Sequence, residues 1–195
     1  LFIDLAIRLA GRAVGGPAKT AIISSSLMGS ISGSAVANTA TTGTFTIPMM
    51  RSAGFRPVTA AGIQAAASSG GALMPPVMGA SAFLMAEFLA VPYSSIVLAA
   101  LVPAILYYIA LFIQADLEAA KLGIRAIPKE DIPDRRKVLV GVHFVLAFAV
   151  LIYLLFWQRY QPERAALWSA VVLIATSLAI GYDGVRPSVR TVFSA

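Results

Sequence analysis

Two stretches of the chain combine small hydroxyl and amide residues with helix-breaking residues, inside sequence that is otherwise apolar. The first runs from residue 29 to 39 and reads GSISGSAVANT, and the second runs from residue 68 to 76 and reads SSGGALMPP. Ser, Thr and Asn side chains and unwound backbone carbonyls offer neutral oxygens. Such oxygens can replace part of the hydration shell of a cation such as sodium without burying a carboxylate. The residue types therefore predict a cation site built from neutral oxygens.

Close helix packing is the alternative explanation for these small residues. Ser34, Ala35, Ala37 and Ala40 would suit a contact between membrane helices, and packing is the simpler role for any single Ser or Thr here. For Gln64 an interhelical hydrogen bond is favoured over contact with a ligand. Packing does not explain two glycines followed closely by two prolines within one apolar span. The two stretches taken together therefore favour a binding site over packing alone.

Other chemistries lack the residues they need. The run from residue 29 to 33 is not the G-x-S-x-G elbow of serine hydrolases, because Ile31 occupies the position of the nucleophile. The chain has no cysteine, which excludes thiolate metal sites and cysteine nucleophiles. It has one histidine, His143. It also has no phosphate-binding G-x-x-x-x-G-K-[ST] loop, so energy for any work must come from an ion gradient rather than from ATP.

The composition indicates an integral membrane protein. Of the 195 residues, 58% are hydrophobic and 12% charged, whereas soluble domains carry about 25% charged residues. The net charge of +6 is explained by basic loops that follow the positive-inside rule, and no nucleic-acid partner is expected. The lipid bilayer is therefore the predicted surroundings of an all-α membrane fold.

The apolar stretches predict a re-entrant helical hairpin, a discontinuous helix and about three full transmembrane helices. A spanning helix needs roughly 20 apolar residues. The predicted elements are a cytoplasmic connecting segment (1–19), the re-entrant hairpin (20–50), the discontinuous transmembrane helix (57–92), transmembrane helices at 95–120, 138–157 and 165–182, and a cytoplasmic basic loop (121–137).

The charge distribution is the reason for predicting that segment 20–50 re-enters rather than crosses. Its two arms have about 15 residues each, or about 22 Å of helix, which is too short to span the bilayer. A single crossing would place the six basic residues of loop 121–137 on the side opposite the basic segment 1–19, against the positive-inside rule. A hairpin that enters and leaves on one face puts both segments in the cytoplasm.

Several motifs resemble the large membrane subunit of TRAP (tripartite ATP-independent periplasmic) transporters. They are GGPAK at 15–19, SGSAVAN at 32–38, TGTFTIPMM at 42–50, AAASSGG at 65–71 and MPPVMGA at 74–80. The forms PPVMG and TGTFTIP are most similar to the fused permeases of the TAXI subclass. The similarity is specific from about residue 11 to 131.

The resemblance implies one half of an inverted-repeat, elevator-type permease in the bacterial inner membrane. In such a system a periplasmic solute-binding protein delivers an organic acid, a small membrane subunit or its fused equivalent assists, and sodium drives uptake without a further cofactor. By position, the resemblance assigns sodium binding to Ser32, Gly33, Ser34, Asn38, Ser68, Ser69, Gly70 and Gly71. It assigns the substrate carboxylate to Asn38, Thr41, Thr42 and Pro75.

Three other functions stay open on the sequence alone. A dicarboxylate–sodium symporter without a binding protein would use the same kind of re-entrant hairpin at its site. An intramembrane hydrolase would need a hairpin serine in contact with His143. A scaffold subunit would pack both polar stretches dry against helices. We also expect the chain to be an internal piece of a longer polypeptide, with the second hairpin outside it.

Overall fold

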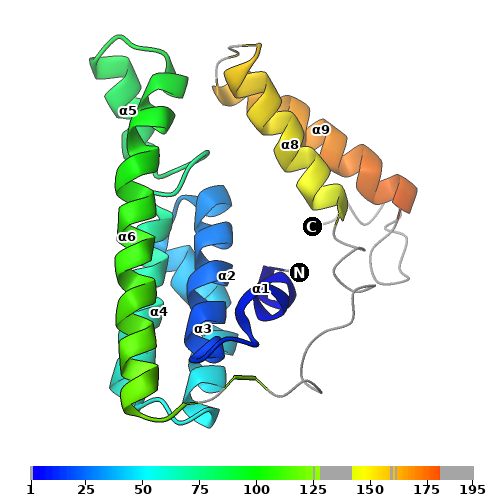
Figure 1. The fold of residues 1–195 in the computed structure, drawn as a ribbon. Helices are drawn as coiled ribbons and strands as arrows, with labels where there is room; N and C mark the ends of the chain where they lie inside the picture. Colours follow the sequence, from blue (N-terminus) through cyan, green and yellow to red (C-terminus); the bar gives the residue numbers. More distant parts are fainter. Residues whose placement is uncertain (1, 125, 128–141, 159, 161, 181–195) are drawn as a thin grey trace. The chain divides into compact units, whose positions relative to one another are not determined.

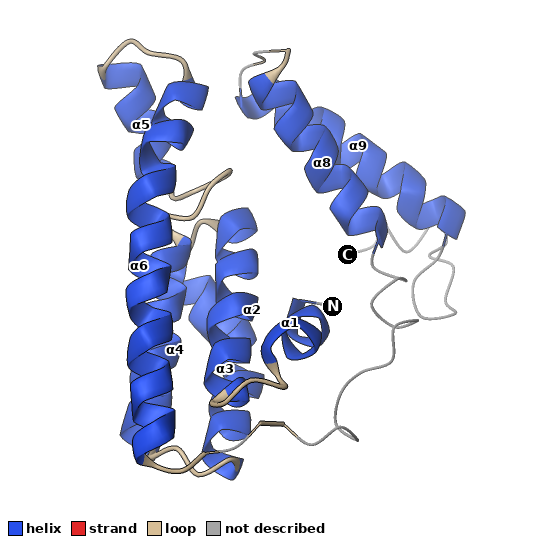
Figure 2. Ribbon diagram, viewed as in Figure 1, coloured by secondary structure: helices blue, strands red, loops and turns tan. Residues whose placement is uncertain are grey.

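The structure is a computed structural model that describes residues 2–124, 126–127, 142–158, 160 and 162–180. These residues form eight helices and no strand (Figures 1 and 2). The predicted all-helical fold is therefore confirmed for the described part of the chain. The helices are α1 (Phe2–Ala10), α2 (Gly16–Ser32), α3 (Ala35–Ser52), α4 (Pro57–Gly71), α5 (Ala80–Phe88), α6 (Tyr93–Lys121), α8 (Val142–Phe156) and α9 (Pro162–Ile180).

The chain divides into two compact units. The first comprises Leu1–Val91 and Ser95–Pro133, and so contains α1 to α5 and most of α6. The second comprises Pro92–Ser94 and Asp134–Ala195, and contains α8 and α9. Both stretches that predict chemistry belong to the first unit.

Helices α2 and α3 form a tight hairpin whose turn is specified by local sequence. Helix α2 ends at Ser32, where Gly33 takes a left-handed backbone conformation (φ 61°) and its N–H donates to the carbonyl of Gly29. Glycine is the residue that adopts this conformation without strain. Helix α3 then begins with Ser34 as its N-cap, whose Oγ accepts a 3.3 Å hydrogen bond from the backbone N–H of Ala37. Two residues therefore reverse the chain direction.

The discontinuous helix is interrupted later than the sequence suggests. Helix α4 continues through Ser68–Gly71, and the irregular segment covers residues 72–79 before α5 begins at Ala80. This segment contains a cis peptide bond between Pro75 and Pro76. Prolines lack the N–H that would continue a helix, whereas the two glycines remain helical and lie where neighbouring helices approach closely. A Cβ on Gly70 would overlap the ring of Tyr107.

Helix α6 is, within the described part of the chain, the one helix long and apolar enough to cross a membrane. It has 29 residues and covers the whole predicted span 95–120. Its packed face is formed by Ala104, Tyr108, Leu111, Ala115 and Ala119. Its opposite face exposes Leu98, Leu101, Val102, Ile105, Ile109 and Ile113. A row of exposed aliphatic side chains of this length suits contact with lipid.

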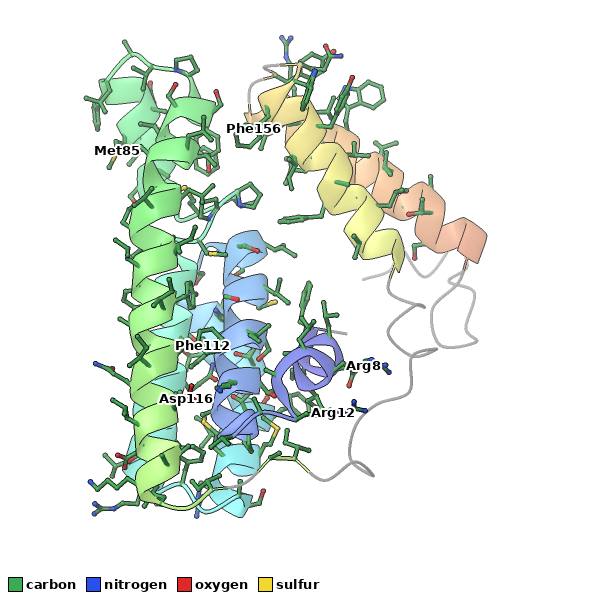
Figure 3. All side chains as sticks on the ribbon, in the orientation of Figure 1. Arg8, Arg12, Met85, Phe112, Asp116 and Phe156 are labelled. Atoms are coloured by element: carbon green, nitrogen blue, oxygen red, sulfur yellow. The ribbon has the colours of Figure 1, made fainter. Side chains whose placement is uncertain are left out.

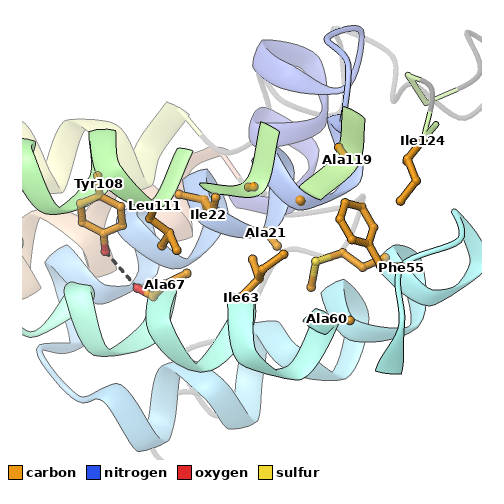
Figure 4. Packing of buried hydrophobic residues seen from close by; sticks show 13 residues of the cluster. Ala21, Ile22, Phe55, Ala60, Ile63, Ala67, Tyr108, Leu111, Ala119 and Ile124 are labelled. Carbon is orange, nitrogen blue, oxygen red and sulfur yellow. Dashed lines mark hydrogen bonds between the residues drawn. The ribbon is translucent and has the colours of Figure 1, made fainter. Parts of the chain in front are cut away.

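Side chains on α6 attach it to α2 and α4. The hydroxyls of Tyr107 and Tyr108 donate to the backbone carbonyls of Ala66 (2.8 Å) and Ala67 (3.0 Å) on α4. Figure 4 shows the second of these bonds beside the buried cluster, in which alanines from α2, α4 and α6 allow close helix packing. Asp116, labelled in Figure 3, forms a 2.7 Å ion pair with Lys19 of α2.

Helices α8 and α9 pack against each other in the second unit. Their apolar segments, Val145–Phe156 and Arg164–Ser177, are shorter than a full span. The predicted spans 138–157 and 165–182 extend into residues that the structure does not describe. Most of the basic loop 121–137 and the side chain of His143 also lie outside the described part. Predictions for these residues, including the Ser–His contact of a hydrolase, stay predictions.

Candidate functional site

The tip of the α2–α3 hairpin lies against the irregular segment 72–79. The backbone N–H of Val77 donates to the carbonyl of Ser30 at 3.2 Å. A Cβ on Gly33 would overlap the carbonyl oxygen of Met78, so only glycine fits at the turn. Met78 itself holds a left-handed conformation (φ 59°), which is strained for a side-chain-bearing residue. Two non-helical segments, more than 40 residues apart in sequence, therefore meet backbone to backbone.

Four helix ends converge at this contact. Helices α2 and α4 end there, at Ser32 and Gly71, whereas α3 and α5 begin there, at Ala35 and Ala80. Helix C-termini carry a partial negative charge and N-termini a partial positive charge. The arrangement can therefore attract a cation toward one pair of ends and an anionic group toward the other.

Helices α2 and α4 touch through two glycines just below the tip. A Cβ on Gly71 would lie 2.7 Å from the Cα of Gly29 and 3.0 Å from Nδ2 of Asn38. The Asn38 amide thus covers the glycine crossing from α3. It donates from Nδ2 to the carbonyl of Ser25 at 2.7 Å, and its Oδ1 accepts from Thr42 at 3.1 Å. Asn38 therefore fastens the two arms of the hairpin where they cross α4.

A second polar cluster surrounds Gln64, deeper between the same three helices. The Gln64 Nε2 lies 3.0 Å from Ser25 Oγ, 2.7 Å from Thr42 Oγ1 and 2.9 Å from Ser68 Oγ. Its Oε1 accepts a 2.6 Å hydrogen bond from Thr46 Oγ1. We call these five residues the Gln64 cage; each is at most 5% exposed. The cage holds α2, α3 and α4 together by side-chain hydrogen bonds.

The site is electrically neutral in its side chains. The buried polar residues of the described chain are all uncharged, and no group of three His, Asp or Glu residues there could hold a metal. Any cation bound near the tip would therefore meet hydroxyl, amide and carbonyl oxygens, the ligand type that the sequence predicts.

The residues assigned by resemblance fall into three places. Ser32, Gly33 and Ser34 are at the hairpin tip and partly exposed, with Pro75 in the segment opposite. Asn38, Thr42, Ser68, Gly70 and Gly71 are buried between the helices. Ser69 and Thr41 are exposed, and their hydroxyls donate to the carbonyls of Ala65 and Ala37 in their own helices.

Ser25, Thr46 and the central position of Gln64 did not emerge as site features from the sequence. Gln64 was expected to form an interhelical hydrogen bond; the structure gives it four partners, three of them on other helices. One signal was present: Asn38, Thr42 and Thr46 recur every four residues, as do Gln64 and Ser68. That spacing places polar side chains on one helix face.

The sequence of the chain matches a known family. The family model described as "Tripartite ATP-independent periplasmic transporter, DctM component" matches residues 1–194. An uncharacterized protein y4mL of Sinorhizobium fredii is 28% identical over 180 residues, which cover 90% of this chain and 42% of that protein.

Two further relatives are named as permeases. The 2,3-diketo-L-gulonate TRAP transporter large permease protein YiaN of Escherichia coli is 37% identical over 43% of this chain and 19% of its own length. A putative TRAP transporter large permease protein of Haemophilus influenzae is 32% identical over 65% of this chain and 29% of its own. The chain thus spans less than half the length of these relatives. It belongs to the DctM component family of tripartite ATP-independent periplasmic transporters.

Proposed function

We propose that the chain forms part of the large permease of a sodium-driven system that takes up organic acids, as a transporter rather than an enzyme. The observation that carries this proposal is the contact between the hairpin tip and segment 72–79. Non-helical backbone at membrane depth is tolerated where it is buried in protein or lines a cavity, and secondary transporters build their sites from such broken helices. We propose that the hairpin is re-entrant and that the permease works by an elevator motion.

The convergence of helix ends supports a division of roles among the residues. We propose that sodium binds at the tip residues Ser32, Gly33 and Ser34, together with the end of α4 at Ser69–Gly71, because two helix C-termini favour a cation there. The substrate carboxylate then lies toward the beginnings of α3 and α5, near Thr41 and Pro75. Asn38, Thr42 and Ser68 support the site by holding the helices in place, since their polar atoms already bond within the protein.

The family also suggests partners and a location. We propose a periplasmic solute-binding protein that delivers the organic acid, and a small membrane subunit or its fused equivalent of the TAXI type. The permease would cross the bacterial inner membrane several times, with the basic loop 121–137 in the cytoplasm.

The test is uptake of a labelled organic acid into liposomes that contain the full-length protein, with and without its binding protein and an inward sodium gradient. We expect uptake to require both. Ser34→Ala should raise the half-saturating sodium concentration. Ser52→Ala is the matched control, because Ser52 is an exposed serine at the other end of α3 whose hydroxyl also bonds backbone (Met49 carbonyl, 2.9 Å).

The symporter and the scaffold each have their own outcome in this assay. Uptake that does not need the binding protein would favour the dicarboxylate–sodium symporter. Uptake that ignores sodium would contradict the coupling. Equal sodium dependence of Ser34→Ala and Ser52→Ala would show that the tip is not the sodium site. A complete absence of uptake, with a folded protein and its partners present, would favour the scaffold.

A further inference from the structure

The Gln64 cage is organised around one hydrogen-bond donor, the side-chain nitrogen of Gln64, which hydroxyl oxygens surround. Three hydroxyl oxygens from three helices, Ser25 Oγ, Thr42 Oγ1 and Ser68 Oγ, lie within 3.0 Å of one nitrogen, Gln64 Nε2. The Gln64 side chain has no exposed surface. A point surrounded by three converging oxygens and shielded from water is also the arrangement that a small cation requires.

In the structure the Gln64 amide turns its nitrogen toward these oxygens. The Thr42 hydroxyl directs its one proton at Asn38, 2.8 Å from the carbonyl oxygen and 3.1 Å from Oδ1, so it accepts from Gln64. The Thr46 hydroxyl lies 2.6 Å from Gln64 Oε1 and 2.9 Å from the carbonyl of Thr42 and shares its one proton between these two acceptors, while the amide oxygen points away from the other three hydroxyls. The two N–H bonds of Nε2 therefore point at the hydroxyl oxygens, with one bond shared between two of them.

We propose that Gln64 closes this cage to cations, because its amide N–H groups supply the positive partial charge that the converging oxygens would otherwise take from an ion. The coupling ion, which rests on the function proposed above, then binds outside the cage. Gln64 is thus a specificity-determining residue: it decides that the buried hydroxyls hold helices together instead of holding sodium.

The side chain of glutamate has the same shape but no N–H group. A carboxylate at position 64 would face four hydroxyl groups and no charged residue, since Ser25 of α2, Thr42 and Thr46 of α3 and Ser68 of α4 are all neutral. A buried carboxylate without a counter-charge is strongly unfavourable. Either a proton or a cation must therefore neutralise it, which turns the closed cage into an ion-dependent one.

The experiment compares thermal unfolding of the purified full-length protein in sodium chloride and in choline chloride between pH 5 and pH 9. The variants are Gln64→Glu and the control Gln158→Glu, where Gln158 is exposed. In choline, Tm of Gln64→Glu should fall as pH rises above about 4.3, where the carboxyl ionises in the unfolded chain, by on the order of 1–2 °C for each pH unit, and should level off once the buried carboxyl itself ionises. Sodium should restore Tm at pH 9. The wild type and Gln158→Glu should show no such fall with pH, and sodium should raise their Tm by the same amount at every pH.

Matching profiles for Gln64→Glu and Gln158→Glu would overturn the proposal, because a closed, dry cage cannot accept a charge without a response. A second variant decides the question if Gln64→Glu does not fold. Ser25→Ala removes one cage oxygen and should leave the apparent sodium Kd, read from the rise of Tm with sodium, within about twofold of wild type. A tenfold weaker Kd would show that the native cage holds the ion, which also overturns the proposal.

These readouts separate the cage from the transport proposal. A wild type whose Tm ignores sodium at every pH would contradict the sodium coupling, and the pH profile of Gln64→Glu would still decide whether the cage is closed.

Discussion

The substitutions Gly29→Ala and Gly62→Ala should have opposite effects on the free energy of unfolding, because Gly29 of α2 contacts Gly71 of α4 and a Cβ on Gly62 would contact nothing. A Cβ on Gly29 would overlap the Cα of Gly71 and lie 3.1 Å from the Asn38 amide nitrogen. Carbon atoms pack at about 3.5–4.0 Å, so the two backbones would have to separate by about 1 Å. A Cβ on Gly62, in the middle of α4, would meet nothing within 4 Å.

The expected size of each effect follows from these contacts. Overpacking at a helix contact typically costs about 1–3 kcal/mol, and strain on the Asn38 hydrogen bond adds about 1 kcal/mol. The helix-propensity gain of Ala over Gly returns about 0.5–1 kcal/mol. Gly29→Ala should therefore lower the free energy of unfolding by about 1–3 kcal/mol. Gly62→Ala should raise it by about 0.5–1 kcal/mol.

The assay is unfolding of the full-length protein in mixed micelles by titration with SDS, followed by helical circular dichroism, alongside uptake into liposomes. Because the glycine crossing sets how the tip meets segment 72–79, Gly29→Ala should also reduce uptake, whereas Gly62→Ala should not. If Gly29→Ala stabilises the protein as much as Gly62→Ala does, the two helices do not touch at this point. The geometry of the site derived above would then be wrong.

Three other contacts give measurable predictions. Tyr108→Phe removes the hydrogen bond to the Ala67 carbonyl and should destabilise the protein by about 0.5–1.5 kcal/mol in the same titration; no loss would mean that the bond is not formed. A double-mutant cycle with Lys19→Ala and Asp116→Ala should give a coupling energy of about 0.2–1 kcal/mol that shrinks in high salt, because Asp116 is 45% exposed; coupling unaffected by salt would argue against an ion pair. Asn38→Ala leaves buried partners unsatisfied and should cost about 2–4 kcal/mol, so an effect below 0.5 kcal/mol in unfolding titrations would contradict its bridging role.

Local sequence is sufficient to predict the elements around the site. The turn at Gly33 and the cap at Ser34 follow from rules that involve neighbouring residues only, namely glycine at a helix end and serine at a helix start. The interruption near Pro75 and Pro76 is equally local, because proline cannot continue a helix wherever the rest of the chain lies. The long apolar run of α6 likewise follows from composition.

The side to which each polar residue turns could not be predicted in the same way. Thr41, Thr42, Thr44 and Thr46 follow one another on α3, yet only Thr42 and Thr46 are buried. Threonine on both faces leaves the helix with little amphipathic signal. The choice is made by Gln64 on α4, which bonds Thr42 and Thr46 from a position about 20 residues away.

The same holds for the glycines. Sequence rules expect Gly70 and Gly71 to interrupt a helix, because glycine is a poor helix former. In the folded protein they continue α4, and Tyr107 and Gly29 approach so closely that no side chain fits there. Turns and caps are determined by bonds between neighbours in the chain and can be read from the residues themselves. Burial and close approach are determined by contacts between helices distant in sequence, which exist only once the chain has folded.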